Sequence, residues 1–521
     1  MKTFEKVAPF VKKNLHKLFF GIILIVIIDA GQLYTIKIMQ KAIDSIGREG
    51  FTTNSLLYAS LFIVGITVLI TILRYFWRIA LIGTAWMIDR DLRQLYYNHL
   101  MKLSANFYNK TKTGDLMAYA TNDMNAIRML IAFGFVVGVD ILVIAIASLF
   151  FMIDISLRLT LLAIIPTPFL SIIIIYFGKR IHAKFRKVQK TFATMSGIVQ
   201  ESISGIRVVK AFVQEEAELE KMSESAREYV EVNISLVKII AMFHPVMFLI
   251  INICMGIVLI FGGEAAMLYE ISMGEFIAFF QYLGMLVWPM IAIGWIVNLY
   301  QRGTASLKRL NSILEVEPEI TDNQVNSEIK NLKGKVSFKN LRFQYKEDSP
   351  LIFDDISFEI ETGKTLAIVG RTGCGKTTII DLLTRVYNPP GNTIFIDDNE
   401  LYNIPLETLR TNVVMVPQDI FLFSDTVASN ISLGNYQADM KEIEEAAKTA
   451  QIFHAIEEFE NGFDTVIGER GVTLSGGQKQ RLAISRALLT NPNILILDDA
   501  LSSVDTKTEK SILHDLIKMR E

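Results

Sequence analysis

The sequence has 521 residues, 51% of them hydrophobic and 20% charged, a balance that excludes a disordered chain. Its 52 Lys and Arg against 54 Asp and Glu give a net charge of −2, so there is no basic excess to neutralise nucleic acid phosphates. Two cysteines and six scattered histidines exclude a disulfide framework and offer no metal-ligand spacing. We therefore expect no nucleic acid partner.

The apolar residues gather before about position 302, in runs long enough to cross a bilayer as helices, which takes about 20 residues. Charged residues are rare within these runs, whereas the rest of the chain is typical of a soluble domain. The pattern predicts six membrane-spanning helices, at about 18–37, 55–80, 129–153, 158–179, 239–263 and 276–301.

Lys and Arg are distributed unevenly between the connections of these spans. The segment before the first span and the long connections Arg74–Arg128 and Lys179–Lys238 are rich in both, while the alternate connections are short and mixed or acidic. Because cytoplasmic connections carry the excess of positive charge, both termini are expected in the cytoplasm.

The two basic connections are too long for turns, and their apolar spacing predicts helices that continue out of the membrane, which we call arms. An arm of about 25 residues would reach roughly 40 Å. Thr113–Leu116 and Ser204–Arg207 interrupt the arms where a helical hairpin would turn. We expect the arms to transmit motion to a soluble domain, although arms that only stiffen the bundle remain an alternative.

Asp29 and Asp140 lie inside apolar runs, where each carboxylate costs roughly 3 kcal/mol at the bilayer centre. Either they face a central cavity and meet a cationic substrate or a partner helix, or they lie near helix ends, hydrated or paired. Both residues are therefore candidate substrate contacts.

The soluble part follows a polar helical stretch. We place a transmembrane domain at 1–320, a linker at 321–335 and a second domain at 336–521, which begins with short strands at 336–338, 341–345, 352–360 and 365–369.

A phosphate-binding loop, G-x-x-x-x-G-K-[ST], follows the last of these strands and precedes the apolar helical stretch 379–386. Glycines let backbone N–H groups close on phosphates, the helix N-terminus adds its dipole, Lys376 reaches the β- and γ-phosphates, and the Thr377 hydroxyl ligates Mg²⁺. The predicted nucleotide-binding residues are Gly370, Arg371, Thr372, Gly373, Cys374, Gly375, Lys376, Thr377 and Thr378.

A second acidic strand supplies the metal partner of this loop. The apolar run Ile494–Leu497 ends in Asp498, which we assign to Mg²⁺, and in Asp499, which is placed to orient or deprotonate the attacking water. The alternative, that this carboxylate pair only caps a helix, is the weaker one beside a phosphate loop.

The remaining motifs make the chain resemble an ABC transporter half of the exporter type: a six-span helical bundle with long cytoplasmic arms, fused to an α/β P-loop nucleotide-binding domain. Gln418 matches the Q-loop, Tyr345 the aromatic that stacks on adenine, Asp505 the D-loop, and Gly468–Gly471 the exporter-specific loop. The family's signature sequence is matched by Leu474, Ser475, Gly476, Gly477 and Gln478.

The resemblance implies the mechanism. Two nucleotide-binding domains sandwich two ATP molecules, each between the phosphate loop of one domain and the signature of the other, with Mg²⁺ held by Thr377, Gln418 and Asp498. ATP-driven closure and hydrolysis-driven opening would move the arms and switch the cavity between inward and outward access. A second ABC half is therefore an obligatory partner.

One departure from the family pattern concerns the catalytic base, because Asp499 stands where the family consensus has glutamate. An aspartate withdraws the carboxylate by roughly 1 Å, which can cost on the order of a hundredfold in rate. With its intact signature, the chain resembles the degenerate-site subunit of bacterial heterodimeric multidrug exporters. That resemblance implies a weakly hydrolysing own site, a partner that carries the glutamate, and the bacterial cytoplasmic membrane.

A second departure is that the chain stops at Glu521, before the strand and switch histidine with which the family's nucleotide domain ends. We expect an incomplete domain, and His514 is no substitute because Lys510–Met519 is typical of a helix.

The expected function is ATP-driven export of amphipathic compounds, multidrug or lipid-like, with membrane lipid and a small amphipathic substrate as further partners. A homodimeric exporter of lipid, peptide or siderophore, and a mainly regulatory ATP-clamp subunit, remain alternatives.

Overall fold

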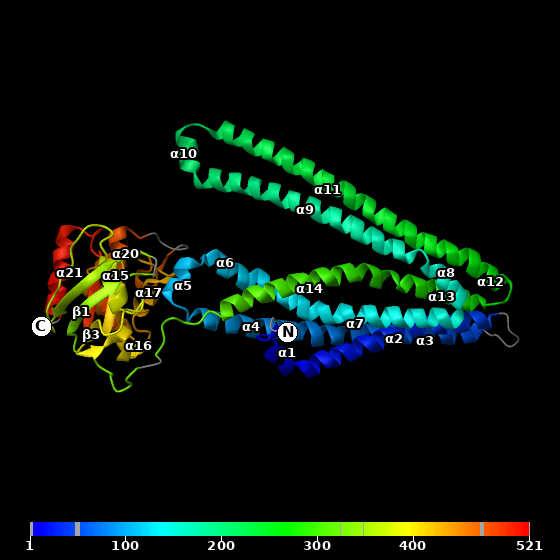
Figure 1. Cartoon of the computed structure of the whole chain (residues 1–521), viewed down its shortest axis with the longest axis horizontal. Helices are drawn as coiled ribbons and strands as arrows, with labels where there is room; N and C mark the ends of the chain where they lie inside the picture. The colour runs from blue at the N-terminus through cyan, green and yellow to red at the C-terminus, as the bar shows by residue number, and fades with distance from the viewer. Residues whose placement is uncertain (1–3, 47–52, 323–324, 347–348, 469–473, 520–521) are drawn as a thin grey trace. The chain divides into compact units, whose positions relative to one another are not determined.

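The structure is a computed structural model that describes residues 4–46, 53–322, 325–346, 349–468 and 474–519 (Figure 1). It divides into two compact units. The helical unit comprises Met1–Asn98 and Leu116–Glu315, and the mixed unit comprises His99–Asp115 and Val316–Glu521. The tip of the first arm thus belongs to the mixed unit.

The helical unit is built from long helices, several of which continue into one another through π-helical segments at Ile79–Gly83, Tyr119–Asp123 and Val258–Gly262. The helices are α1 (Ala8–Lys13), α2 (Leu15–Ser45), α3 (Thr53–Arg78), α4 (Thr84–Leu100), α6 (Thr113–Ala118), α7 (Met124–Ile155), α8 (Leu157–Ile164), α9 (Thr167–Ser204), α10 (Ile206–Ala211), α11 (Glu215–Ile257), α12 (Gly263–Met267), α13 (Met273–Met285) and α14 (Val287–Leu314).

Five helices among the described residues are long and apolar enough to cross a membrane, and they include five of the six expected spans. The stretch expected at 158–179 is not one continuous span, because the chain breaks between α8 and α9 at Ile165–Pro166. Proline lacks the N–H that a continuing helix needs. Beyond this break, α9 reaches Lys179 and Arg180 soon after it begins, so its apolar part is short.

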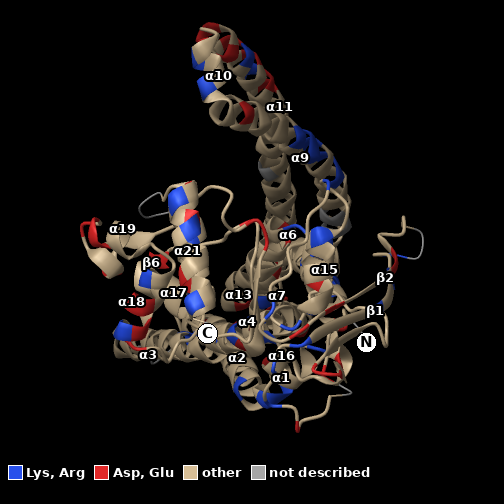
Figure 2. Cartoon of the chain, turned by 90° about the vertical axis from the view of Figure 1, so that its left-hand side faces the viewer, with Lys and Arg blue, Asp and Glu red and all other residues tan. Residues whose placement is uncertain are grey.

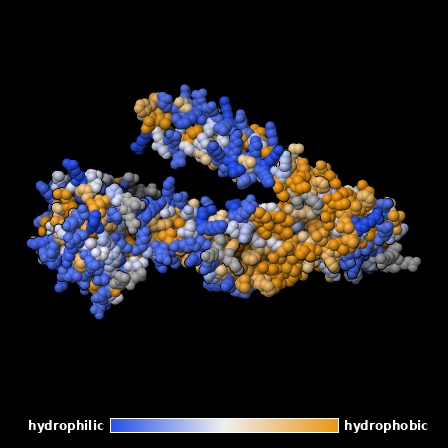
Figure 3. Space-filling view, viewed as in Figure 1, coloured by the Kyte–Doolittle hydropathy of each residue, from blue (hydrophilic) through white to orange (hydrophobic). Residues whose placement is uncertain are grey.

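Apolar side chains cover the surface of the helical unit over α2, α3, α7 and α13 (Figure 3). Since lipid is as apolar as these side chains, helices in a membrane associate through close packing, for which small residues serve best. Gly303 of α14 is one such residue, because a Cβ there would lie 2.6 Å from the Leu130 side chain of α7.

The second arm is the hairpin of α9 and α11, joined by α10. Val188, Val232 and Leu236 form a small core between the two helices, and the rings of Phe192 and Tyr229 lie 5.8 Å apart. Lys, Arg, Asp and Glu gather along α9, α10 and the adjoining end of α11 (Figure 2), as expected outside a membrane. The turn predicted at Ser204–Arg207 is confirmed.

The interruption of the first arm lies elsewhere than predicted. Thr113–Leu116 is helical, within α6, and the chain instead reverses around the short helix α5 (Ala105–Lys110). Gly114 does not mark a turn, because the backbone around it is helical and a Cβ there would meet no atom within 4 Å.

Among its described residues, the mixed unit contains three small sheets. An antiparallel sheet has the order β2-β1-β3-β4, β5 pairs with β8 in parallel, and β6 pairs with β7 antiparallel. The strands are β1 (Val336–Phe343), β2 (Phe353–Ile360), β3 (Ile394–Ile396), β4 (Asn399–Glu400), β5 (Val413–Val416), β6 (Asp425–Thr426), β7 (Val466–Ile467) and β8 (Ile494–Leu497). Besides α5, its helices are α15 (Lys376–Leu383), α16 (Leu406–Asn412), α17 (Val427–Ser432), α18 (Met440–Thr449), α19 (Phe453–Glu457), α20 (Gly476–Leu488) and α21 (Thr506–Lys518).

The described part of the mixed unit has two hydrophobic cores. One joins β1, β2 and β3 to α15 and α16, and the other joins α17, α18 and α20. The strand expected at Thr365–Val369 is not formed: the segment pairs with no described strand, and Val369 is 89% exposed. An apolar run becomes a strand only where a neighbour completes its hydrogen bonds. The helix expected over Lys510–Met519 is confirmed by α21.

Candidate functional site

The phosphate-binding loop has a backbone that requires glycine. Gly373 and Gly375 have φ angles of +82° and +95°, and a Cβ at Gly375 would lie 2.7 Å from the Phe353 ring. The loop leads directly into α15, whose N-terminus presents free backbone N–H groups. Lys376 Nζ donates to the carbonyls of Gly370 at 2.9 Å and Arg371 at 3.0 Å, so its ammonium lies over the loop.

Gln418 and Asp498, two of the three residues assigned to Mg²⁺, follow neighbouring parallel strands. β5 and β8 pair with Val416 opposite Leu497, so Gln418 and Asp498 emerge at the same edge. Thr377 Oγ1 donates to Asp498 Oδ2 at 2.9 Å, which brings the loop hydroxyl to the strand carboxylate. Hydroxyl and carboxylate oxygens suit a cation that keeps several waters and binds phosphate, so this pair fits Mg²⁺.

Tyr345 lies beside the same loop. Its hydroxyl is 3.0 Å from Thr378 Oγ1, and its ring is edge-on to those of Phe343 and Tyr387, with centroids 5.1 and 5.0 Å away. Burial raises the pKa of Tyr345, so the hydroxyl stays protonated. The side chain is still 43% exposed, which leaves ring surface available for stacking.

The signature segment begins α20 with a complete capping box. Ser475 Oγ accepts from Gln478 N at 3.3 Å, and Gln478 Oε1 accepts from Ser475 N at 2.9 Å. Leu474 is buried, and a Cβ on Gly476 or Gly477 would lie 3.2 Å or 2.7 Å from Ser503. The glycines thus allow close packing against the D-loop.

Asp505 of the D-loop caps α21. Its Oδ1 accepts from the backbone N–H groups of Thr508 at 3.0 Å and Lys507 at 3.1 Å, and these bonds, chiefly that from Thr508, hold the pKa of Asp505 below its ordinary value. Most of the expected exporter-specific loop, from Glu469 to Gly471, lies outside the described residues.

Asp499 is exposed and has a left-handed backbone, with φ +53°. Its carbonyl accepts from Gln480 Nε2 at 3.4 Å and from Ser502 Oγ at 3.0 Å. The same Gln480 amide donates to Ser502 Oγ at 3.0 Å and accepts from Ser503 N at 2.8 Å. Gln480 therefore ties the signature helix to the catalytic candidate and to the D-loop, a role that its place behind the signature did not reveal.

The two intramembrane carboxylates differ in their contacts. Asp140 of α7 accepts a hydrogen bond from Trp288 Nε1 of α14 at 3.0 Å. Asp29 of α2 is 1% exposed, and its Oδ2 has no hydrogen-bond partner among the described residues. It lies within electrostatic range of Asp140 and of Arg74.

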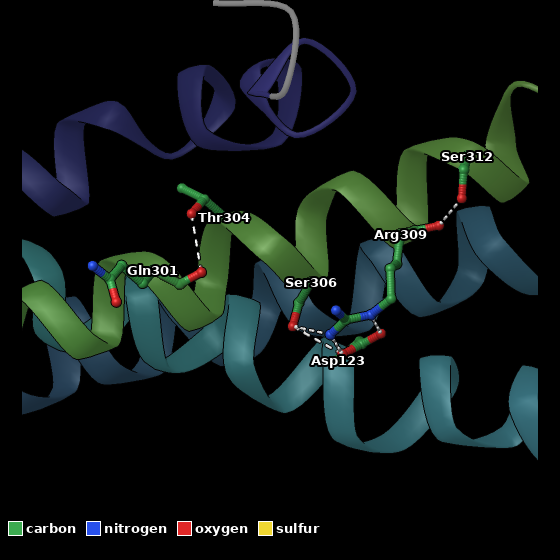
Figure 4. Close-up of polar contacts among 6 residues, drawn as sticks. All are labelled: Asp123, Gln301, Thr304, Ser306, Arg309 and Ser312. Carbon is green, nitrogen blue, oxygen red and sulfur yellow. Dashed lines mark hydrogen bonds and ion pairs between the residues drawn. The ribbon is translucent and has the colours of Figure 1, made fainter. Parts of the chain in front are cut away.

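A polar cluster that sequence reasoning missed joins α14 to the segment before α7 (Figure 4). The Asp123 carboxylate accepts from Arg309 Nε at 2.9 Å, from Arg309 Nη2 at 2.5 Å and from Ser306 Oγ at 2.9 Å. Burial alone would raise the pKa of Asp123, but the bonds and charge of Arg309 and the Ser306 bond lower it below its ordinary value. No local motif could have shown this pair, because it spans 186 positions.

Comparison with known proteins places both units in one family. Residues 18–290 match the ABC transporter transmembrane region, and residues 353–502 match the ABC transporter family.

Several relatives match over nearly the whole chain. The probable multidrug resistance ABC transporter ATP-binding/permease protein YheI of Bacillus subtilis is 37% identical, over 99% of this chain and 88% of its own length. The multidrug resistance-like ATP-binding protein MdlA of Escherichia coli is 35% identical, over 99% and 87%. An ATP-dependent lipid A-core flippase of Syntrophus aciditrophicus is 33% identical, over 85% and 74%. The chain therefore belongs to the ABC transporters, as an exporter-type half-transporter in which a helical transmembrane region is fused to an ABC ATPase domain.

Proposed function

We propose that the chain is one half of a heterodimeric ATP-driven exporter of amphipathic compounds, and that its own ATP site hydrolyses slowly. One observation carries the proposal: a fully capped signature helix stands beside an aspartate at the position of the family's catalytic glutamate. The signature would complete a competent site on the partner, while Asp499 would serve the weaker site on this chain.

In this account each residue of the loop has a separate task. Lys376 and the N–H groups at the start of α15 bind phosphate oxygens, and Tyr345 stacks on the base. Thr377, Asp498 and Gln418 would hold Mg²⁺, which supplies charge neutralisation to the phosphates when bound. Asp499 orients the attacking water from a carboxylate roughly 1 Å too far back.

A cavity of about 470 Å³ within the helical unit supports an amphipathic substrate. Its wall combines apolar side chains such as Ile70 and Met285 with amides, hydroxyls and one cation. The polar lining residues are Gln32, Thr35, Thr67, Thr71, Arg74 and Gln281. Asp29 and Asp140 do not line this cavity, and we propose that they add negative charge near a substrate rather than direct contacts in this wall.

The names of the relatives support the same substrate class. Two are described as multidrug resistance proteins and one as a lipid A-core flippase. The bacterial source of these relatives favours the cytoplasmic membrane of a bacterium. The Lys and Arg distribution favours a cytoplasmic location for both termini.

Transport by the pair tests the proposal. The chain and a candidate partner half are reconstituted in vesicles, and ATP-dependent movement of a fluorescent amphipathic dye is measured for wild type and Lys376→Ala. Lys364→Ala is the matched control, since Lys364 is exposed and lies on the same segment before the loop.

We expect wild type and Lys364→Ala to move the dye, and Lys376→Ala to slow transport without abolishing it. Undiminished transport by Lys376→Ala, with ATPase unchanged, would favour the regulatory clamp. Absence of dye movement by the wild-type pair would contradict the proposal.

A further inference from the structure

We propose that Asp381 is a positioning residue of the nucleotide site, where its carboxylate holds water ligands of the Mg²⁺ ion assigned to Thr377 and Asp498. The inference rests on the Mg²⁺ site of the proposed function. It adds a second carboxylate to that site, from a position beyond the phosphate-loop motif.

The helix geometry brings Asp381 to the metal side of α15. Asp381 lies four residues after Thr377, and residues four apart share one face of a helix. Helical side chains lean toward the N-terminus, so the Asp381 carboxyl leans back toward the turn that carries the Thr377 hydroxyl. That hydroxyl donates to Asp498 Oδ2 at 2.9 Å, which places the end of β8 on the same side.

The electrostatics of Asp381 agree with this placement. Burial raises the pKa of Asp381, and the negative charge of Asp498 raises it further. The same carboxyl acts on Tyr345, whose hydroxyl lies 3.0 Å from Thr378 Oγ1. Asp381 is therefore within electrostatic range of both the adenine-side tyrosine and the metal-binding carboxylate.

The Asp381 side chain is half-buried and makes no hydrogen bond or ion pair within the part of the chain that the structure describes. Its backbone carbonyl is occupied, because it accepts from Val386 N at 2.8 Å and from Tyr387 N at 3.3 Å. The nearby ammonium of Lys376 donates to loop carbonyls instead. A carboxylate left in this state costs free energy, which a divalent cation beside Asp498 would offset.

Contact through water suits both the cation and the distance. Mg²⁺ keeps several waters and is bound through one or two carboxylates together with substrate phosphates. Asp381 is one helical turn, roughly 5 Å, farther from the loop than Thr377, which leaves room for a water between carboxylate and ion. Groups that hold such ligands in place typically contribute 10- to 100-fold to metal affinity.

Nucleotide binding with and without metal tests the inference and requires neither hydrolysis nor transport. The affinity of the full chain for a fluorescent, non-hydrolysable ATP analogue is measured in EDTA and in Mg²⁺, and the ratio of the two is the Mg²⁺-dependent gain. Asp381→Asn removes the charge and keeps the shape of the side chain. Asp354→Asn is the matched control, because Asp354 is an exposed aspartate of the same unit, paired with Arg342 at 3.6 Å.

We expect the Mg²⁺-dependent gain to fall about tenfold in Asp381→Asn and to stay at the wild-type value in Asp354→Asn. In EDTA, Asp381→Asn should bind the analogue at least as tightly as wild type, because a negative charge near the phosphates is gone. The difference in gain should persist in about 0.5 M KCl, since a contact inside the site is screened little.

An unchanged gain in Asp381→Asn would overturn the inference, and so would a difference that disappears in salt. Equally weak binding in EDTA and in Mg²⁺ would make Asp381 a structural residue of α15 and overturn it as well. Asp498→Asn separates this failure from that of the proposed function: a gain lost in Asp498→Asn but kept in Asp381→Asn leaves the Mg²⁺ site standing, whereas a wild-type chain without any gain would overturn both.

Discussion

The mixed unit carries two functional segments, the phosphate-binding loop and the signature. They differ in how many of the expected functional groups are in place. On the signature side, Ser475 and Gln478 cap α20 reciprocally, the glycines lie against Ser503, and Gln480 secures the D-loop. On the phosphate-loop side, Lys376, Thr377 and Asp498 are in place, but the catalytic position holds an exposed aspartate.

A nucleotide-binding domain has two roles: its signature completes a partner's ATP site, and its catalytic base serves its own site. The difference between the two segments shows that one role can be impaired while the other is kept. A signature acts through helix N–H groups and a hydroxyl, which need only a well-formed helix start. A catalytic base acts through one carboxylate at one distance, so a single methylene matters. Under the proposed function, the chain would support hydrolysis in a partner while performing it slowly itself.

The largest effect on ATPase activity should come from a substitution in the signature segment. Gly477→Ala would place a Cβ 2.7 Å from the Ser503 carbonyl and displace the signature or the D-loop. We expect ATPase activity of the pair to fall about a hundredfold, as for a misplacement of about 1 Å. Gly391→Ala is the control, since a Cβ there meets only ordinary contact at 3.7 Å and should leave activity unchanged. If the pair kept its ATPase activity with Gly477→Ala, the proposed difference between the signature and the phosphate-binding loop would be contradicted.

Lengthening the side chain at position 499 by one methylene should raise ATP turnover at the chain's own site. Asp499→Glu, measured in a pair whose partner has lost its own catalytic glutamate, should raise ATP turnover about 10- to 100-fold. Asp499→Asn serves as the control and should give no rise, because an amide cannot act as a base. An unchanged rate in Asp499→Glu would mean that another feature limits this site.

The loop thiol offers a chemical probe of the same side. Cys374 is exposed and its Sγ lies 4.0 Å from Lys376 Nζ, whereas Cys254 is buried. Alkylation with N-ethylmaleimide should weaken ATP binding about tenfold or more, Mg-ATP should protect the thiol, and Cys374→Ser should be insensitive. ATP binding that is unchanged after complete alkylation would show that the side chain points away from the phosphates.

Substitutions in the helical unit should have the smallest effect on the difference in ATPase activity between the two sites. Asp123→Asn weakens the cluster with Arg309 and Ser306 and should destabilise the chain by about 1–3 kcal/mol, lowering its thermal midpoint. Glu444→Gln, in the exposed Lys448 pair, should change stability by less than about 0.5 kcal/mol. The ATPase ratio between the two sites should not change in either variant.

The Asp123 cluster also predicts a pH dependence. The folded pKa of Asp123 is lower than its ordinary value of 3.8, so its contribution to stability is complete above that value and is lost as pH falls through the folded pKa. Thermal midpoints of wild type and Asp123→Asn should therefore converge in strong acid. A difference that stays constant down to the lowest measurable pH would contradict this assignment.

Sequence reasoning succeeded where a motif carries its own structural requirement. The loop from Gly370 to Thr378 and the strand before Asp498 each depend on neighbours within a few positions. Periodicity also predicted five spans and the turn at α10 correctly. The stretch at 158–179 is divided into two helices at Pro166, so the sixth span stays a prediction, and the strand at 365–369 is not formed because a strand depends on a partner.

The remaining omissions concern long-range pairs. Asp123 with Arg309 and Asn109 with Tyr387 are separated by 186 and 278 positions, so no local pattern marks them. The attachment of His99–Asp115 to the mixed unit was missed for the same reason, since its hydrogen bonds to Glu319 and Tyr387 join positions far apart in the sequence.

Steady-state ATPase activity of the chain purified alone, then with candidate partner halves, tests the central claim most directly. The account predicts that the lone chain is nearly inert and that a partner restores activity which depends on the partner's own glutamate. Brisk, cooperative hydrolysis by the lone chain would contradict it, and would identify a homodimeric exporter in which Asp499 suffices.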